Sequence, residues 1–147
     1  MRIHHIGIVV SDLDKALKTF GFKVDDLSET VEDPEQKNTL YFCYDEDNHL
    51  WLEFIEPWDE TSTTSVFAKK FGNGIHHLGY ITDDIKCAEK ELRSTSGNFF
   101  LGCYRIHVKS FGGDIQTLFF SSNGIIMEFF CHKPKHVAYA ISDQNNS

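Results

Sequence analysis

Two histidines and two glutamates stand at matching places in a sequence pattern that occurs twice. His5 and His77, which are 72 residues apart, each follow another histidine and precede an apolar residue and a glycine. Glu53 and Glu128, which are 75 residues apart, each interrupt a run of large apolar residues. Two imidazoles and two carboxylates make a mixed nitrogen–oxygen donor set that suits a borderline divalent ion. The pattern therefore predicts one site for zinc, nickel, cobalt, manganese or iron, with open positions for a substrate as in catalytic sites.

The repetition extends beyond these four residues and indicates two copies of one module. The segment 3–10 matches 75–82 without a gap, and the segment 50–55 matches 125–130. The two offsets agree within three residues, so the two matches belong to one duplication.

Each copy predicts a βαβββ module, and we expect an α+β fold in which two tandem modules form a curved mixed sheet shaped like a cup. The predicted strands are 3–10, 22–30, 38–45 and 49–56 in the first module, and 75–82, 99–101 or 103–109, 114–121 and 125–131 in the second. The predicted helices are 12–19, capped by Ser11 or Asp12, and 83–94, capped by Asp83. The predicted boundaries are 1–56 for the first module, 57–74 for a linker with a short helix at 65–71, 75–131 for the second module, and 132–147 for a C-terminal tail.

Strand side chains alternate between the two faces of a sheet, so the four residues can be assigned to a face. Around each of them, the residues of the opposite face are mostly large and apolar, which suits packing under a helix. We therefore expect His5, Glu53, His77 and Glu128 on the hollow face of the cup. A carboxylate between large apolar residues is costly unless it is paired or bound to a metal ion.

The other six histidines are expected to have different roles. His4 and His76 also recur, but strict alternation puts them on the opposite face, where they would support the ligands or serve the structure. The four histidines without a counterpart in the other copy are expected at the surface: His49, His107, His132 and His136.

Composition narrows the classes of partner and compartment. The formal charge of −8 argues against a nucleic-acid partner, which needs a concentrated basic surface. No apolar run approaches the roughly 18 to 20 residues needed to cross a bilayer, so no membrane partner is expected. The N-terminus lacks the features of a secretory signal, and the four cysteines are scattered singly. We therefore expect a cytoplasmic protein whose cysteines are reduced core residues.

The repeated segments resemble the vicinal oxygen chelate superfamily, which includes glyoxalase I, methylmalonyl-CoA epimerase, extradiol dioxygenases and bleomycin-resistance proteins. The resemblance covers about residues 1–131 and is carried by the segments His4–Val10, Leu52–Pro57, Gly74–Leu78 and Ile126–Phe129. It is nearest to the glyoxalase I and epimerase branches, whose members have a His-Glu/Gln-His-Glu set, and Ser65–Phe71 favours the epimerase branch. The resemblance implies that His5, Glu53, His77 and Glu128 bind the metal ion and that the chain forms a homodimer.

The resemblance and the residues together predict chemistry on a small carbonyl substrate. The ion would bind two substrate oxygens and stabilise the enolate that forms when an α-proton is lost. Glu128 is then expected to be the base and Glu53 to remain a ligand, with Glu35 a weaker candidate for the base. The predicted activity is that of an isomerase, epimerase or lyase of the methylmalonyl-CoA epimerase or glyoxalase I kind.

Two alternative functions remain open at this point. A non-catalytic antibiotic-binding protein of the same fold would need no metal set. An extradiol-type dioxygenase would need ferrous iron on two histidines and one carboxylate.

Overall fold

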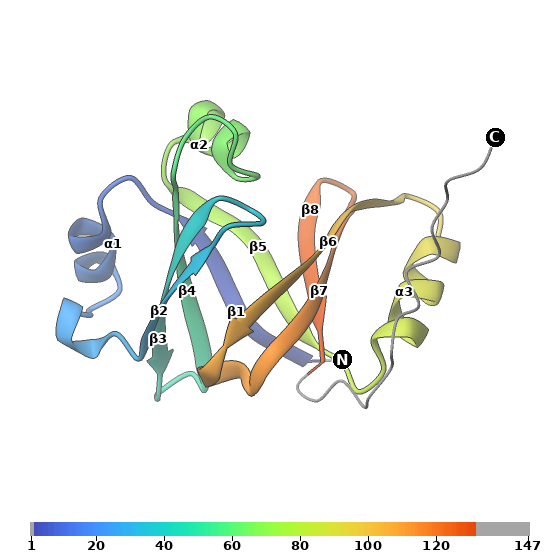
Figure 1. Ribbon diagram of the computed structural model, residues 1–147, viewed down its shortest axis with the longest axis horizontal. Helices are drawn as coiled ribbons and strands as arrows, with labels where there is room; N and C mark the ends of the chain where they lie inside the picture. The colour runs from blue at the N-terminus through green and yellow to red at the C-terminus, as the bar shows by residue number, and fades with distance from the viewer. Residues whose placement is uncertain (1, 132–147) are drawn as a thin grey trace.

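Eight strands form one mixed sheet that curls into a half-barrel in the computed structural model, which describes residues 2–131 (Figure 1). Across the sheet the strands follow the order β2-β3-β4-β1-β5-β8-β7-β6. The strands are β1 (Arg2–Val9), β2 (Glu29–Asp33), β3 (Asn38–Asp45), β4 (Leu50–Pro57), β5 (Gly74–Ile81), β6 (Asn98–Val108), β7 (Gly113–Ser122) and β8 (Ile125–Phe130). The helices are α1 (Leu13–Thr19), α2 (Ser65–Phe71) and α3 (Ile85–Ser94), with short 3-10 turns at Val24–Asp26 and Lys109–Phe111. The predicted α+β cup is confirmed.

The two halves of the sheet are joined through their first strands. β1 pairs with β5 in the antiparallel direction. On its other side β1 pairs with β4, and β5 pairs with β8, both in parallel. The strands that carry His5, Glu53, His77 and Glu128 are therefore the four central strands of the sheet. A cluster built on them takes one imidazole and one carboxylate from each half of the chain.

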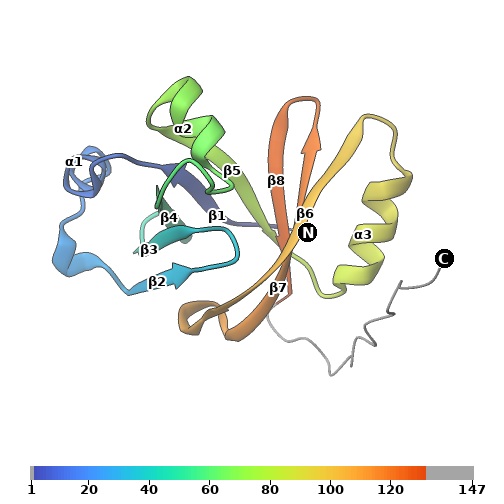
Figure 2. The ribbon, with the colours of Figure 1, turned by 45° about the horizontal axis from the view of Figure 1, so that its top comes forward.

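The two faces of the sheet hold different sets of apolar residues, as the alternation predicts. On the outer face, Leu52 and Phe54 pack with Leu17 of α1, and Phe120 and Phe129 pack with Leu92 of α3. Figure 2 shows these two helices on the outer sides of the two halves, with the sheet between them. The inner face holds a separate buried cluster: Val9, Leu40, Phe42, Ile55, Val108, Phe111, Ile115 and Phe130.

Capping side chains decide where the two outer helices begin. Asp12 accepts a hydrogen bond from the Lys15 N–H at 3.1 Å, so α1 begins at the predicted place. The cap of α3 is Asp84, whose carboxylate accepts the N–H groups of Lys86 and Cys87 at 3.0 Å. The predicted cap, Asp83, was one residue too early.

Two predicted strands differ from the structure. The segment 22–30 was expected to be extended, but Asp26 accepts the Lys23 N–H at 2.7 Å and folds Val24–Asp26 into a 3-10 turn. The strand therefore starts only at Glu29. The alternatives 99–101 and 103–109 are parts of one strand, β6, because a single register shift near Leu101 lets pairing with β7 continue.

One β-bulge interrupts β1 and another interrupts β5, and the two bulges occupy equivalent positions in the two modules. Between Ile3 and His5 the register of β1 against β5 advances by two residues on β1 and by one on β5, so His4 is the extra residue. Gly7 pairs with His77 and the next residue, Ile8, pairs with Ile75, so His76 is the extra residue on β5. A bulge breaks strict alternation and re-aims a side chain.

The free edges of the sheet meet through two glutamates of the first half. Glu35 accepts a hydrogen bond from the Arg105 N–H of β6 at 2.9 Å. Glu29 of β2 accepts the N–H groups of Lys109 at 2.9 Å and Ser110 at 2.8 Å. These three bonds join β2 and the β2–β3 turn to β6 and the 3-10 turn that follows it, and they close the mouth of the cup.

Two further expectations can be compared with the structure. The four cysteines form no disulfide, but only Cys43 is buried; Cys87 and Cys103 are exposed and Cys131 is half-buried. The prediction that all four are core residues was wrong, because three of them lie outside the apolar clusters. None of the helices within residues 2–131 is long and apolar enough to cross a membrane.

Candidate metal centre

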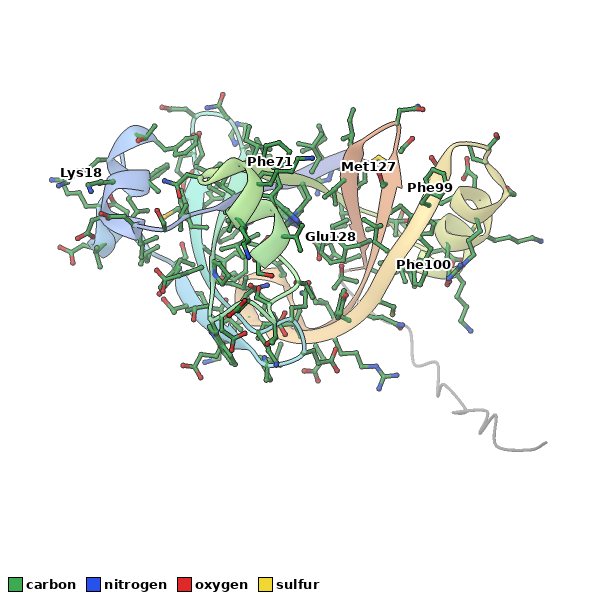
Figure 3. The ribbon with its side chains drawn as sticks, turned by 90° about the horizontal axis from the view of Figure 1, so that it is seen from above. Lys18, Phe71, Phe99, Phe100, Met127 and Glu128 are labelled. Carbon is green, nitrogen blue, oxygen red and sulfur yellow. The ribbon has the colours of Figure 1, made fainter. Side chains whose placement is uncertain are left out.

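The four predicted residues come together as one buried cluster. Their ligand atoms all lie within 4.8 Å of one another. His5 Nε2 lies 2.7 Å from the nearer Glu128 oxygen and 3.2 Å from His77 Nε2. His77 Nε2 lies 3.1 Å from the nearer oxygen of Glu53 and 3.2 Å from that of Glu128. Figure 3 shows Glu128 in the interior of the curled sheet, away from its outer helices.

Two glycines make this convergence possible. In the sheet Gly7 lies between Glu53 and His77, and Gly79 lies between His5 and Glu128. A Cβ atom on Gly7 would lie 2.1 Å from the His77 ring, and one on Gly79 would lie 2.0 Å from the His5 ring. Each imidazole therefore occupies the space over a glycine of the neighbouring strand. From the sequence, these glycines were noted only as neighbours of the histidines. Their recurrence in both copies could have indicated that a side chain approaches them closely.

The cluster is almost completely shielded from solvent. His5 is 1%, His77 3%, and Glu53 and Glu128 each 7% exposed. Burial raises the pKa of Glu128, but electrostatic interactions and hydrogen bonds with His5 and His77 outweigh it and hold that pKa well below its usual range. Burial lowers the pKa of His77, but Glu128 and Glu53 outweigh it and raise that pKa to about 9. Without an ion, His77 is therefore protonated at neutral pH.

One oxygen of the cluster is left without a hydrogen bond. Glu53 Oε2 is buried, and no hydrogen bond from the described residues reaches it, although His77 Nε2 is 3.1 Å away. A buried carboxylate oxygen in this state is expensive. A divalent ion shared by the four residues would satisfy it, and two nitrogen and two oxygen donors suit zinc, nickel, cobalt, manganese or iron. The residues therefore fit a metal ion.

A residue that sequence reasoning missed holds the second oxygen of Glu128. Thr117 of β7 is fully buried, and its hydroxyl donates a short hydrogen bond to Glu128 Oε1. The signal in the sequence was one polar residue at an inward position between Ile115 and Phe119. Glu35, the weaker candidate for the base, is instead bonded to the Arg105 N–H at the sheet edge.

His4 and His76, which precede His5 and His77, do not lie where alternation put them. His4 packs edge-on against Phe111 and Phe130 of the inner cluster, with ring centroids 4.5 and 4.8 Å away. His76 lines the same cavity as Glu53 and Glu128. The prediction that both face the helices was wrong, because the bulges turn them inward.

The unrepeated histidines divide into two groups. His49 and His107 are exposed, as predicted. His132 and His136 lie outside the described residues.

The cavity beside the cluster is small. It offers about 20 Å³ to the centre of a water molecule, enough for about one water or ion. Its walls come from both halves and are apolar, apart from the cluster, His76 and four neutral polar side chains: Gln36, Asn38, Thr64 and Thr117. A carbonyl substrate needs more room than this, so its binding would require the cavity to widen.

Comparison with known proteins gives one family and several similar structures. Residues 4–110 match the Glyoxalase/Bleomycin resistance protein/Dioxygenase superfamily. The uncharacterized protein YqjC of Bacillus subtilis (strain 168) is 33% identical over 99 residues, and the match spans 65% of this chain and 65% of that protein. The chain thus matches less than two thirds of the length of this curated relative.

The similar solved structures include two methylmalonyl-CoA epimerases. The enzyme from Mycobacterium tuberculosis has a TM-score of 0.72 and 22% identity, over 90% of this chain and 89% of that one. A variant of the enzyme from Streptomyces coelicolor, in complex with 2-nitronate-propionyl-CoA, has a TM-score of 0.67 and 26% identity, over 89% of this chain and 94% of that one.

Proposed function

Because the chain belongs to the Glyoxalase/Bleomycin resistance protein/Dioxygenase superfamily, we propose that it is a metal-dependent isomerase, epimerase or lyase. Its reaction would begin with removal of a proton from the carbon next to a carbonyl group. The observation that carries the proposal is the buried cluster of two imidazoles and two carboxylates with one unsatisfied carboxylate oxygen. Such a donor set is what a divalent ion requires.

The residues of the cluster would have distinct tasks. His5, Glu53, His77 and Glu128 would hold one divalent ion, which supplies Lewis acidity toward a carbonyl oxygen when bound. Glu128 would take the α-proton and return it. Thr117 supports this choice, because its hydroxyl can stay hydrogen-bonded to Glu128 in both protonation states. Glu53 has no such partner among the described residues, which suits a permanent ligand.

The substrate would be a small carbonyl compound, and a coenzyme A thioester is the first class to test. The Streptomyces coelicolor epimerase binds 2-nitronate-propionyl-CoA, and its identity to this chain is 26%. The apolar walls of the cavity suit a short acyl group, while the rest of a larger substrate would stay outside.

Solvent deuterium exchange tests the proposal. The protein loaded with cobalt or zinc is incubated in heavy water with methylmalonyl-CoA, and deuterium at the α-carbon is measured by mass spectrometry. We expect exchange in the wild type and a roughly 10²- to 10⁴-fold slower rate in Glu128→Gln, which should keep the ion. The matched control is Glu56→Gln, a second strand glutamate that lies outside the cluster.

Each other result leads to a definite conclusion. Unchanged exchange in Glu128→Gln would remove Glu128 as the base. A wild-type protein that takes up no stoichiometric ion would indicate a binding module instead. Oxygen uptake with a catechol would indicate a dioxygenase.

A further inference from the structure

A second pair of imidazoles, those of His4 and His76, contacts the imidazoles of His5 and His77. His4 Nδ1 lies 3.2 Å from His5 Nδ1, and His76 Nδ1 lies 3.0 Å from His77 Nδ1. The two contacts are equivalent, because both outer histidines are the extra residues of the bulges in β1 and β5. In a regular strand, consecutive side chains point to opposite faces and could not meet in this way.

The direction of these hydrogen bonds follows from the atoms that face the cluster. His5 and His77 turn Nε2 toward Glu53 and Glu128, so an ion would be bound through the Nε2 lone pairs. In a neutral imidazole the other nitrogen, Nδ1, then carries the proton. This proton has to be donated, and Nδ1 of the preceding histidine is the acceptor at hydrogen-bond distance.

Aromatic contacts hold the outer rings in place. His4 lies edge-on against Phe111 and Phe130, with ring centroids 4.5 and 4.8 Å away. His76 lies edge-on against Phe67 of α2 at 5.1 Å. Their planes are nearly perpendicular to those of His5 and His77, at 87° and 88°. Packing against phenylalanine rings therefore restrains the outer rings in addition to their contacts with His5 and His77.

We propose that His4 and His76 are positioning residues that accept the Nδ1–H of His5 and His77 and so fix both ligands with Nε2 toward the ion. The proposal rests on the proposed metal site but not on the reaction that occurs there. A carboxylate or a backbone carbonyl usually accepts this hydrogen bond from a metal-bound histidine. Here an imidazole nitrogen lies at the acceptor position on both sides.

A pair of substitutions separates acceptance of the hydrogen bond from ring packing. His76→Asn keeps an acceptor oxygen near the position of Nδ1, whereas His76→Leu has similar bulk and no acceptor. We expect His76→Leu to bind Co²⁺ about 10- to 100-fold more weakly in a chelator competition, and to shift the visible absorption of the bound Co²⁺. His76→Asn should restore both to near the wild-type values. The same pair at His4 is an independent repeat, and His49→Leu, at an exposed histidine, is the control.

The outcomes distinguish failure of this proposal from failure of the proposed function. Equal losses in the Asn and Leu variants, or no loss in either, would overturn the positioning role. A wild-type protein that binds no Co²⁺ would overturn the metal site and this proposal together. A third result is that the wild type binds Co²⁺ and the Asn and Leu variants differ as expected, while no deuterium exchange is seen. This result would overturn only the proposed reaction. Amide NMR spectra of each variant identify any that fails to fold, and the second histidine then decides.

Discussion

At the scale of single residues, the buried cluster depends on the absence of two side chains as much as on the four side chains that form it. Gly7 and Gly79 leave the space that the rings of His77 and His5 occupy. Both glycines lie inside strands and neither has a positive φ, so the backbone itself would tolerate an alanine. The reason for glycine here is the close approach of a side chain from the neighbouring strand.

We expect Gly79→Ala to weaken divalent-ion affinity by at least about tenfold, because the new methyl group displaces the His5 ring. Overpacking should also lower the free energy of unfolding by about 1–3 kcal/mol. The matched control is Gly74→Ala on the same strand, where the nearest atom is 3.6 Å from the added Cβ and nothing needs to move. Chelator competition measures the affinity and urea titration measures the stability. Equal affinities in the two variants would show that the ring does not need this space.

The convergence of the four side chains could be predicted from the sequence because the duplication gave a signal. His5, Glu53, His77 and Glu128 recur in register, and strand alternation is enough to bring them to one face. His4 and His76 recur too, but a bulge is one extra residue whose place depends on pairing with a strand 72 residues away. Thr117 has no counterpart signal, because its role comes from the strand beside Glu128.

At the scale of elements, the mouth of the cup is closed by side chains rather than by a strand pair. Glu29 and Glu35 accept three backbone N–H groups from the opposite edge of the sheet. Burial raises the pKa of Glu29, but the bond from the Ser110 N–H and its neighbours outweighs it and lowers that pKa. Glu29 therefore adds stability above its ordinary pKa of 4.5, and this stability is lost as the pH falls below that value.

We expect Glu29→Ala to open this edge more often, because two N–H groups lose their acceptor. The amides of Lys109 and Ser110 should then exchange with solvent about 5- to 30-fold faster near neutral pH, which corresponds to one or two kcal/mol. Hydrogen exchange followed by NMR measures the rates. Glu32→Ala, at an exposed glutamate of the same strand, is the control and should leave them unchanged. Unchanged rates in Glu29→Ala would mean that packing alone closes the mouth.

Elements were predictable where the local signal was strong. Asp12 caps α1 and Ser65–Phe71 forms α2, as the capping and turn residues indicate. The segment 22–30 misled because its apolar residues suggest a strand, while the Lys23–Asp26 hydrogen bond stabilises a turn. The contacts of Glu29 and Glu35 join residues at least 70 positions apart, so no local sequence pattern predicts them.

At the scale of the whole molecule, the duplication places the candidate metal centre at the junction of the two halves. Each half supplies one histidine and one glutamate, and β1 and β5 are the strands where the halves meet. Two βαβββ modules could be predicted from the repeat, but not their pairing through the first strands. An ion bound here would therefore connect residues that separate when the protein unfolds.

Protons would compete with a bound ion for the same imidazoles. In the metal-free protein the pKa of His77 is raised from 6.5 to about 9. Its charged contacts with Glu128 and Glu53 stabilise the fold fully below about pH 6.5, and this stabilisation is lost as the pH rises through 9. Over the same range the imidazole becomes free to bind an ion, because a ligand must be deprotonated.

We therefore expect the stabilisation that a divalent ion gives to increase as the pH rises from about 6.5 to about 9. At a free concentration 100 times Kd the free energy of unfolding should rise by about 2.7 kcal/mol. Urea unfolding at several pH values, with the free ion held constant by a metal buffer, measures the difference from the metal-free protein. His5→Ala should lose this difference, and His107→Ala, at an exposed histidine, should keep it. A difference that stays constant or shrinks with rising pH would contradict this prediction. It would show that the ion does not replace the proton on His77.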